Sequence, residues 1–118
     1  MANDFKRICT PSIGTSLTTI YAVPAGASSA ALESIVIGIT MANKTSSGVT
    51  ASIFIDNEDG SNDVYIVKDA SIPAGASLEV MSGNKLVLQN DGTNGDNLEA
   101  LCSAASSLDV TVSVLEDV

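Results

Sequence analysis

The sequence Val23-Pro24-Ala25-Gly26-Ala27-Ser28 returns almost unchanged as Ile72-Pro73-Ala74-Gly75-Ala76-Ser77. Each copy follows a run of strand-forming residues and precedes another apolar stretch. Proline fixes φ and glycine tolerates positive φ, so a β-branched residue followed by Pro-Ala-Gly ends one strand and turns the chain toward the next. Two copies in 118 residues predict two similar halves built from short strands and tight turns.

We call the two repeated segments, 23–28 and 72–77, the corners. Around them the sequence predicts about eight strands. Apolar and polar residues alternate along most of them, as in strands with one buried face, and Gly, Asn and Asp mark the turns between them. No segment has a helical period. The expected strands lie at residues 17–23, 32–41, 49–55, 64–68, 78–81, 86–88, 98–102 and 108–114.

This pattern predicts an all-β fold, a two-sheet antiparallel β-sandwich of the jelly-roll kind. A Greek-key sandwich of the immunoglobulin type is the alternative. Residues 1–15 show no clear period and are expected to form an extended N-terminal arm, ahead of a single sandwich domain at residues 16–118.

The core is expected to consist of Ile, Val, Leu and Ala, because the chain has only two Phe, two Tyr and no Trp. In two of the expected strands, the alternation of apolar and polar residues predicts which side chains face this core. The inward residues are expected to be Ile35, Ile37, Ile39 and Met41 in one strand and Leu108, Val110, Val112 and Val114 in the other.

The formal net charge is −9, with five basic and fourteen acidic residues. Nucleic-acid affinity comes largely from Lys and Arg that neutralise phosphates, and anionic membrane surfaces repel an acidic protein. We therefore expect neither nucleic acid nor membrane as a partner. The N-terminus lacks the apolar core of a signal peptide, and the apolar run at 35–39 is too short to span a bilayer. These features predict synthesis in a cytoplasm.

Cys9 and Cys102 match no CxxC or zinc-ligand spacing. In a reducing compartment they are expected to be free thiols. A disulfide that ties the arm to a late strand stays open as the alternative.

Two acidic loops, 56–63 and 90–97, offer carboxylate and amide oxygens of the kind that calcium prefers. The EF-hand pattern fails in the first loop, because taking Gly60 as its glycine puts Ile55 at position one. Asp, Asn and Gly also favour plain turns. We predict turns at both places, with no bound metal and no cofactor.

The chain contains no histidine, which excludes Ser-His-Asp and Cys-His catalysis. Phosphate-binding glycine loops and zinc-protease motifs are also missing from the sequence. Any acidic chain contains carboxylate pairs that could serve glycoside hydrolysis, but the scarcity of aromatic residues weighs against a sugar-processing site. The sequence predicts a protein that is not an enzyme.

The arm holds two of the five basic residues and one of the two phenylalanines. Two interpretations are open. In one, Phe5 and Ile8 dock on a neighbouring subunit while Lys6 and Arg7 meet its acidic surface. In the other, the segment forms an extra edge strand of its own domain. Phe5, Lys6, Arg7 and Ile8 are therefore the candidate interface residues.

Four segments carry a resemblance to a known family: residues 1–7, 14–26, 67–75 and 104–116. They resemble small virion structural proteins of tailed bacteriophages, particularly those of marine hosts. The resemblance covers nearly the whole chain and is carried by strand-and-turn sequences without an active site. The chain departs from the family at 90–96, where a shorter turn is expected.

The resemblance implies a capsid decoration (cement) protein or a small tail-associated protein, of β-sandwich fold and often trimeric. It also implies a place in the virion, after synthesis in the host bacterial cytoplasm. The expected partners are further copies of the chain and the major capsid protein or other virion proteins. A neck, tail or fibre protein is the first alternative, and a receptor- or glycan-binding module is a less favoured one.

Overall fold

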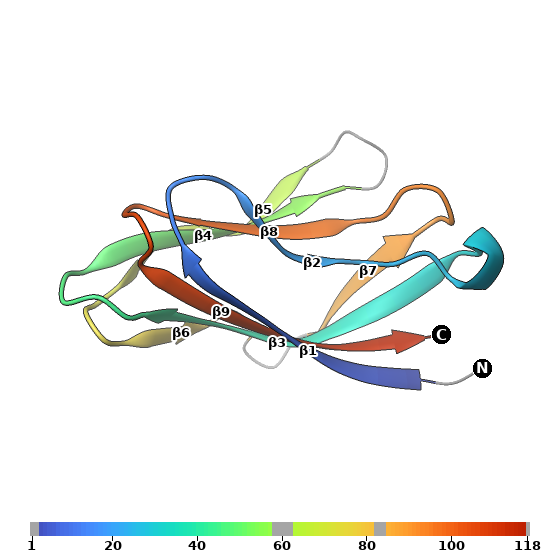
Figure 1. Ribbon diagram of the computed structural model, residues 1–118, viewed down its shortest axis with the longest axis horizontal. Coiled ribbons are helices and arrows are strands. Elements are labelled where there is room, and N and C mark those ends of the chain that lie inside the picture. The colour runs from blue at the N-terminus through green and yellow to red at the C-terminus, as the bar shows by residue number, and fades with distance from the viewer. Residues whose placement is uncertain (1–2, 58–62, 82–84, 118) are drawn as a thin grey trace.

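The computed structural model describes residues 3–57, 63–81 and 85–117 (Figure 1). Within these residues the chain forms nine strands and one short 3-10 turn, η1 (Ala27–Ser29). The strands are β1 (Asn3–Ile13), β2 (Thr18–Ala22), β3 (Leu32–Asn43), β4 (Val49–Asp56), β5 (Val64–Ile72), β6 (Ser77–Glu79), β7 (Leu86–Asn90), β8 (Asn97–Cys102) and β9 (Leu108–Asp117). No helix among the described residues is long and apolar enough to cross a membrane.

The strands form two antiparallel sheets that face each other as two layers (Figure 1). Sheet A has the order β1-β9-β3-β6, and β7 pairs with β3 as well. Sheet B has the order β2-β8-β4-β5. The predicted all-β two-sheet sandwich is confirmed.

The strand pairs are nested, which defines the jelly roll. β7 pairs with residues 32–36 of β3 and β6 pairs with residues 40–42, so β6 and β7 act as one interrupted strand. Counted in this way, β1 pairs with β9, β2 with β8, β3 with β6 and β7, and β4 with β5. The first of eight strands thus pairs with the last, the second with the seventh, and so on inward. This is one long hairpin wrapped into two sheets.

The N-terminal segment forms β1, an edge strand of sheet A. It pairs antiparallel with β9 from Asn3, opposite Asp117, to Ile13, opposite Leu108. Of the two interpretations of this segment, the structure contains the edge strand. Residues 3–13 therefore contribute to the sandwich ahead of residue 16.

The two repeated corners both carry the chain from sheet B to sheet A. The first carries the chain from β2 in sheet B to β3 in sheet A, and the second carries it from β5 in sheet B to β6 in sheet A. The β-branched residue that opens each corner, Val23 or Ile72, is buried. Each copy is thus a crossing between the two layers, anchored in the core by its first side chain.

The backbone differs between the two corners. Gly75 has a φ of 70° and is the third residue of a turn in which the Ala76 N–H donates to the Pro73 carbonyl at 3.1 Å, as a type II turn requires. Gly26 instead has an extended φ of −72°. In the first corner, Ser28 and Ser29 take the positive φ values, 58° and 61°.

A buried asparagine holds each corner to the strand beside it. Asn90, the last residue of β7, donates from Nδ2 to the Val23 carbonyl at 2.8 Å, and Asn43, the last residue of β3, donates from Nδ2 to the Ile72 carbonyl at 3.0 Å. Each side-chain oxygen also accepts the N–H two residues ahead, from Gly92 at 2.8 Å or Thr45 at 2.9 Å. The two corners therefore share a supporting asparagine as well as a repeated sequence. The sequence pattern did not reveal this, because the asparagines lie outside the repeated segments.

The loop after Asn90 packs tightly on the first corner. A Cβ added to Gly95 would lie 2.7 Å from the Val23 carbonyl oxygen. At Gly92, which has a φ of 100°, an added Cβ would collide with the Ser29 carbonyl oxygen. The two glycines of this loop are thus required by close approach to the corner.

The predicted inward face of β3 is wrong in its first half. The register with β9 shifts between Val36 and Gly38, which is a β-bulge, and the bulge reverses the alternation of side chains. Val36 is consequently buried and Ile37 is exposed, whereas Ile39 and Met41 are buried as predicted. Ile35 is only partly buried. In β9 the predicted inward residues, Leu108, Val110, Val112 and Val114, are all buried.

The corner asparagines are expected to be needed for stability. Asn43→Ala or Asn90→Ala leaves a buried carbonyl without its donor, so each variant should lose about 1–3 kcal/mol of unfolding free energy. Asn94→Ala is the matched control, because Asn94 is exposed, and it should change stability by less than about 0.5 kcal/mol. Urea unfolding measures all three; equal effects at Asn90 and Asn94 would contradict the role given to Asn90.

Candidate interaction surface

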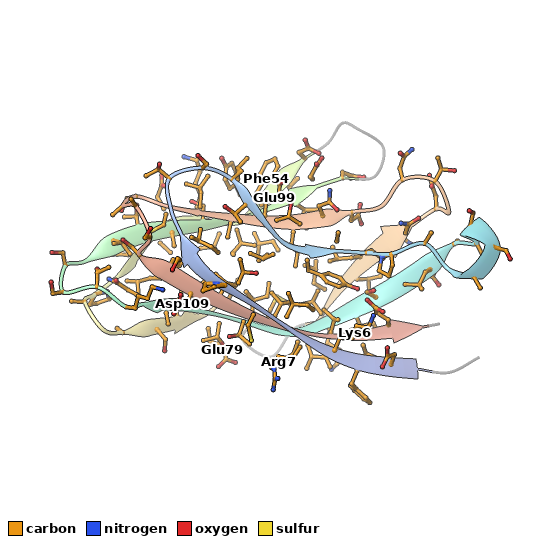
Figure 2. All side chains as sticks on the ribbon, in the orientation of Figure 1. Lys6, Arg7, Phe54, Glu79, Glu99 and Asp109 are labelled. Atoms are coloured by element: carbon orange, nitrogen blue, oxygen red, sulfur yellow. The ribbon has the colours of Figure 1, made fainter. Side chains whose placement is uncertain are left out.

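The four candidate interface residues of β1 divide between two sides of sheet A. Phe5 is 73% exposed and Arg7 is also exposed; Arg7 points away from the sandwich (Figure 2). Lys6 forms an ion pair with buried Glu116, and Ile8 packs against the core. Alternation along the strand thus leaves Phe5 and Arg7 available to a partner and turns Lys6 and Ile8 toward their own domain.

Lys6 belongs to a polar network that joins β1, β2, β3 and β9. Its Nζ lies 3.0 Å from Glu116 Oε1. The Tyr21 hydroxyl donates to Glu116 Oε2 at 2.6 Å and lies 2.7 Å from Ser34 Oγ. The Lys6 ammonium therefore compensates the charge of Glu116 from the Oε1 side. A buried carboxylate requires such a partner.

The network shifts two pKa values upward. The hydrogen bond and negative charge of Glu116 raise the pKa of Lys6 above its usual value. Burial raises the pKa of Tyr21, since it disfavours the phenolate, and the hydrogen bond to Glu116 adds to the rise. Tyr21 is therefore held as a neutral donor, and Glu116 receives a proton donor on one oxygen and a cation beside the other.

A cleft of about 420 Å³ opens beside this network, where the edge strands of the two sheets face each other. Side chains of β1 and β2 form its walls, and Glu116 and Tyr21 contribute polar atoms. Its lining residues are Lys6, Ile8, Thr10, Thr19, Ile20, Tyr21, Ala22, Pro24 and Glu116. The Tyr21 hydroxyl thus bridges the two layers at this open side through Glu116 and Ser34, while the Lys6–Glu116 ion pair joins β1 to β9 within sheet A.

The outer face of sheet A carries a row of four apolar side chains. Phe5 lies opposite Leu115, Leu115 opposite Ile35, and Ile35 opposite Val87. Phe5 and Val87, at the ends of the row, are 73% and 57% exposed. The bulge in β3 adds Ile37, which is 43% exposed. We call Phe5, Leu115, Ile35, Val87 and Ile37 the apolar row.

The outer face of sheet B is more mixed. Its corresponding row runs through Thr19, Glu99, Phe54 and Tyr65, and Figure 2 shows Phe54 and Glu99 on that outer side. The Phe54 and Tyr65 rings meet edge to face, with centroids 5.1 Å apart. Lys68 Nζ lies 5.6 Å from the Tyr65 ring centroid.

The carboxylates of the loop at 90–97 accept backbone N–H groups in the loop or next to it. Asp91 accepts the N–H groups of Thr93 and Asn94 at 2.8 and 2.7 Å, and these bonds lower the pKa of its carboxyl. Asp96 accepts the Gln89 N–H at 2.9 Å. Most of the other acidic loop, 58–62, lies outside the described residues. Among those described, no three His, Cys, Asp or Glu side chains come together in a metal-binding arrangement.

Cys9 and Cys102 are both free thiols in the structure. Cys9 is exposed on β1 and Cys102 is buried at the end of β8. The strands belong to different sheets, so the two residues fill separate positions in the fold.

Sequence reasoning missed Glu116, Tyr21 and Ser34 as a group. One signal was present: Glu116 continues the inward alternation of Leu108, Val110, Val112 and Val114. An acidic residue in an inward position of a strand requires a buried partner. The partners themselves come from β1, β2 and β3, and no local pattern pointed to them.

Comparison with protein-family models gives no match. Comparison with the curated proteins gives none either. Among solved structures, a Bacillus endospore appendage from a family of disulfide-linked pili is 14% identical, with a TM-score of 0.44; the match covers 97% of this chain and 86% of that one.

Virus-particle proteins are among the other similar structures. A mutant VP2 protein of infectious bursal disease virus is 13% identical with a TM-score of 0.48, over 97% of this chain and 35% of that one. The structure of the Gt strain of the same virus is 11% identical with a TM-score of 0.45, and the match covers 96% of this chain and 30% of that one. This chain thus spans about a third of the length of these viral chains. The fold of this chain is established by its own strand pairing.

The Tyr21 network predicts a loss of stability at alkaline pH. An unfolded tyrosine titrates near 10.0, whereas the folded chain keeps the Tyr21 proton to higher pH. Above pH 10 the unfolded state therefore binds fewer protons, and unfolding free energy should fall by about 1.4 kcal/mol per pH unit from this group. Urea unfolding from about pH 9 to 11 should show a shallower fall for Tyr21→Phe. An identical slope in that variant would contradict the account.

Proposed function

We propose that this chain is a non-enzymatic structural protein of a bacteriophage particle that decorates and stabilises the head shell. The resemblance to small virion proteins supports this role, since it extends over nearly the whole sequence. The structural observation that carries the proposal is the apolar row on the outer face of sheet A. A row of apolar side chains in register across four strands, exposed at both ends, is a feature of interaction surfaces.

The apolar row suits a flat, repeated contact with a shell. Covering the exposed part of one such side chain contributes on the order of 1 kcal/mol, so a single copy would bind weakly. A symmetric shell offers many equivalent positions, and contacts between neighbouring copies multiply the effect. The net charge of −9 would keep the outer surface hydrated and make decorated particles repel one another.

Self-association is part of this proposal. The resemblance implies a trimer in which the chain also contacts the major capsid protein or other virion proteins. A mass in solution of three times 12.0 kDa would support that number of copies.

There are two alternatives to a role in head decoration. The same fold would serve in a neck, tail or fibre with far fewer copies. A receptor- or glycan-binding role is favoured by the Phe54–Tyr65 pair on sheet B, because Tyr65 is 46% exposed and aromatic faces are a common platform for ligands. Binding on a glycan array that Tyr65→Ala abolishes would support the receptor role, and a blank array would count against it.

Copy number in purified particles separates these roles. Quantitative mass spectrometry against the major capsid protein should find hundreds of copies per particle, as a shell with many equivalent positions requires. A few to a few dozen would place the chain in the neck, tail or fibres, and its absence from the particle would overturn the virion role.

A charge placed in the apolar row should weaken shell binding. Val87→Glu would bury an unpaired carboxylate against the shell, so rebinding to stripped particles should fall roughly tenfold or more. Val64→Glu is the matched control, because Val64 is 51% exposed on sheet B. Co-sedimentation with particles measures both variants; equal losses would show that sheet A is not the binding face.

A further inference from the structure

β1 has one unpaired side. It lies at the end of sheet A, next to β9, and no other described strand pairs with it. Its ladder is regular from Asn3 to Thr10, and the register then shifts before Ile13, where Pro11 lacks an N–H and Ser12 has a φ of 58°. The backbone groups before Pro11 thus form an open edge, which is a template for pairing with another chain.

We propose that this edge pairs antiparallel with β1 of a second copy, with Phe5 opposite Phe5 of the partner copy on a two-fold axis. Asp4 of each copy then lies opposite Lys6 of the other. The contact would join two four-strand-wide sheets into one continuous sheet. It is a property of the free chain and does not rest on the virion role.

Symmetry restricts the registers that need comparison. A two-fold axis perpendicular to a continuous sheet keeps each face on the same side, so an outward residue must lie opposite an outward one. Phe5 and Arg7 point outward, and Lys6 and Ile8 point inward. Each allowed register therefore places one residue of β1 on the axis, opposite its own copy.

Charge selects among these registers. With Asp4, Lys6 or Arg7 on the axis, like charges meet directly, which destabilises a cross-strand pair. With Ile8 on the axis, no opposite charges meet, and Pro11 enters the ladder opposite Phe5. Only the axis at Phe5 gives two opposite-charge pairs. Lys6 can take part because its side chain is 47% exposed and an ammonium has three donors, of which Glu116 does not use all.

Packing supports the same register. Phe5 is the end of the apolar row and the most exposed large apolar side chain among the described residues, at 73%. Directly opposed aromatic side chains stabilise antiparallel pairs. The pair would also make the apolar rows of two copies continuous. A two-fold contact uses one patch twice, so it is separate from any contact that closes a trimer.

Cysteine trapping tests the register. In a Cys9→Ser background, Phe5→Cys places two thiols directly opposite each other, at a Cα separation of about 4.5–5.5 Å that a disulfide accepts. Mild oxidation should give a disulfide-linked dimer from Phe5→Cys and at least about tenfold less from Arg7→Cys and Ile8→Cys, which report the registers centred on those residues. No dimer from Phe5→Cys, or a faster one from either control, would overturn the proposal.

Charge reversal provides an independent readout. Adding Asp4→Lys to the Phe5→Cys chain puts two lysines opposite each other, so the initial rate of cross-linking should fall several-fold and recover in part at high salt. Glu79→Lys is the control with the same change in charge, because Glu79 is exposed on β6 at the far edge of sheet A. Equal rates for the two variants would show that Asp4 does not face Lys6 of a partner copy.

Discussion

The pairing of β9 with both β1 and β3 is the interaction on which the rest of the structure depends. It joins the last strand to the first and thereby closes the outermost pair of the jelly roll. The inward side chains of β9, from Leu108 to Val114, fill the space between the sheets. Its last inward residue, Glu116, holds Lys6 and Tyr21 at the open side of the sandwich. β9 thus fills the core, pairs with the edge strand β1 and, through Leu115, supplies the middle of the apolar row.

The sequence predicts the inward-facing residues correctly where a strand has one buried face and no bulge. The inward residues of β9 follow from alternation alone, and the turn residues locate the two crossings between the sheets. It failed in β3, because a bulge reverses the alternation and the local apolar pattern stays the same. Gly38 was the available signal, since glycine inside a strand often marks a bulge. The strand order of the jelly roll required pairings between distant segments, which alternation does not specify.

The candidate surface was only partly predictable for the same reason. Phe5, Lys6, Arg7 and Ile8 were identified together from composition, yet their division into two faces depends on β1 being a regular strand. The apolar row is a property of register across four strands, and no stretch of sequence contains it. The corner asparagines show the same limit: Asn43 and Asn90 support repeated corners that lie 29 and 67 residues away in the chain. Long-range pairing therefore determines both the fold and the surface proposed for binding.

The central proposal is that this chain covers a phage head with the outer face of sheet A against the shell. A cryo-electron microscopy reconstruction of purified particles tests it most directly. We predict sandwich-shaped density repeated over the outside of the head, with Val87 and Ile37 directed at the shell and β1 edges of neighbouring copies adjacent. Density confined to the neck or tail, or copies that face the shell with sheet B, would contradict the account.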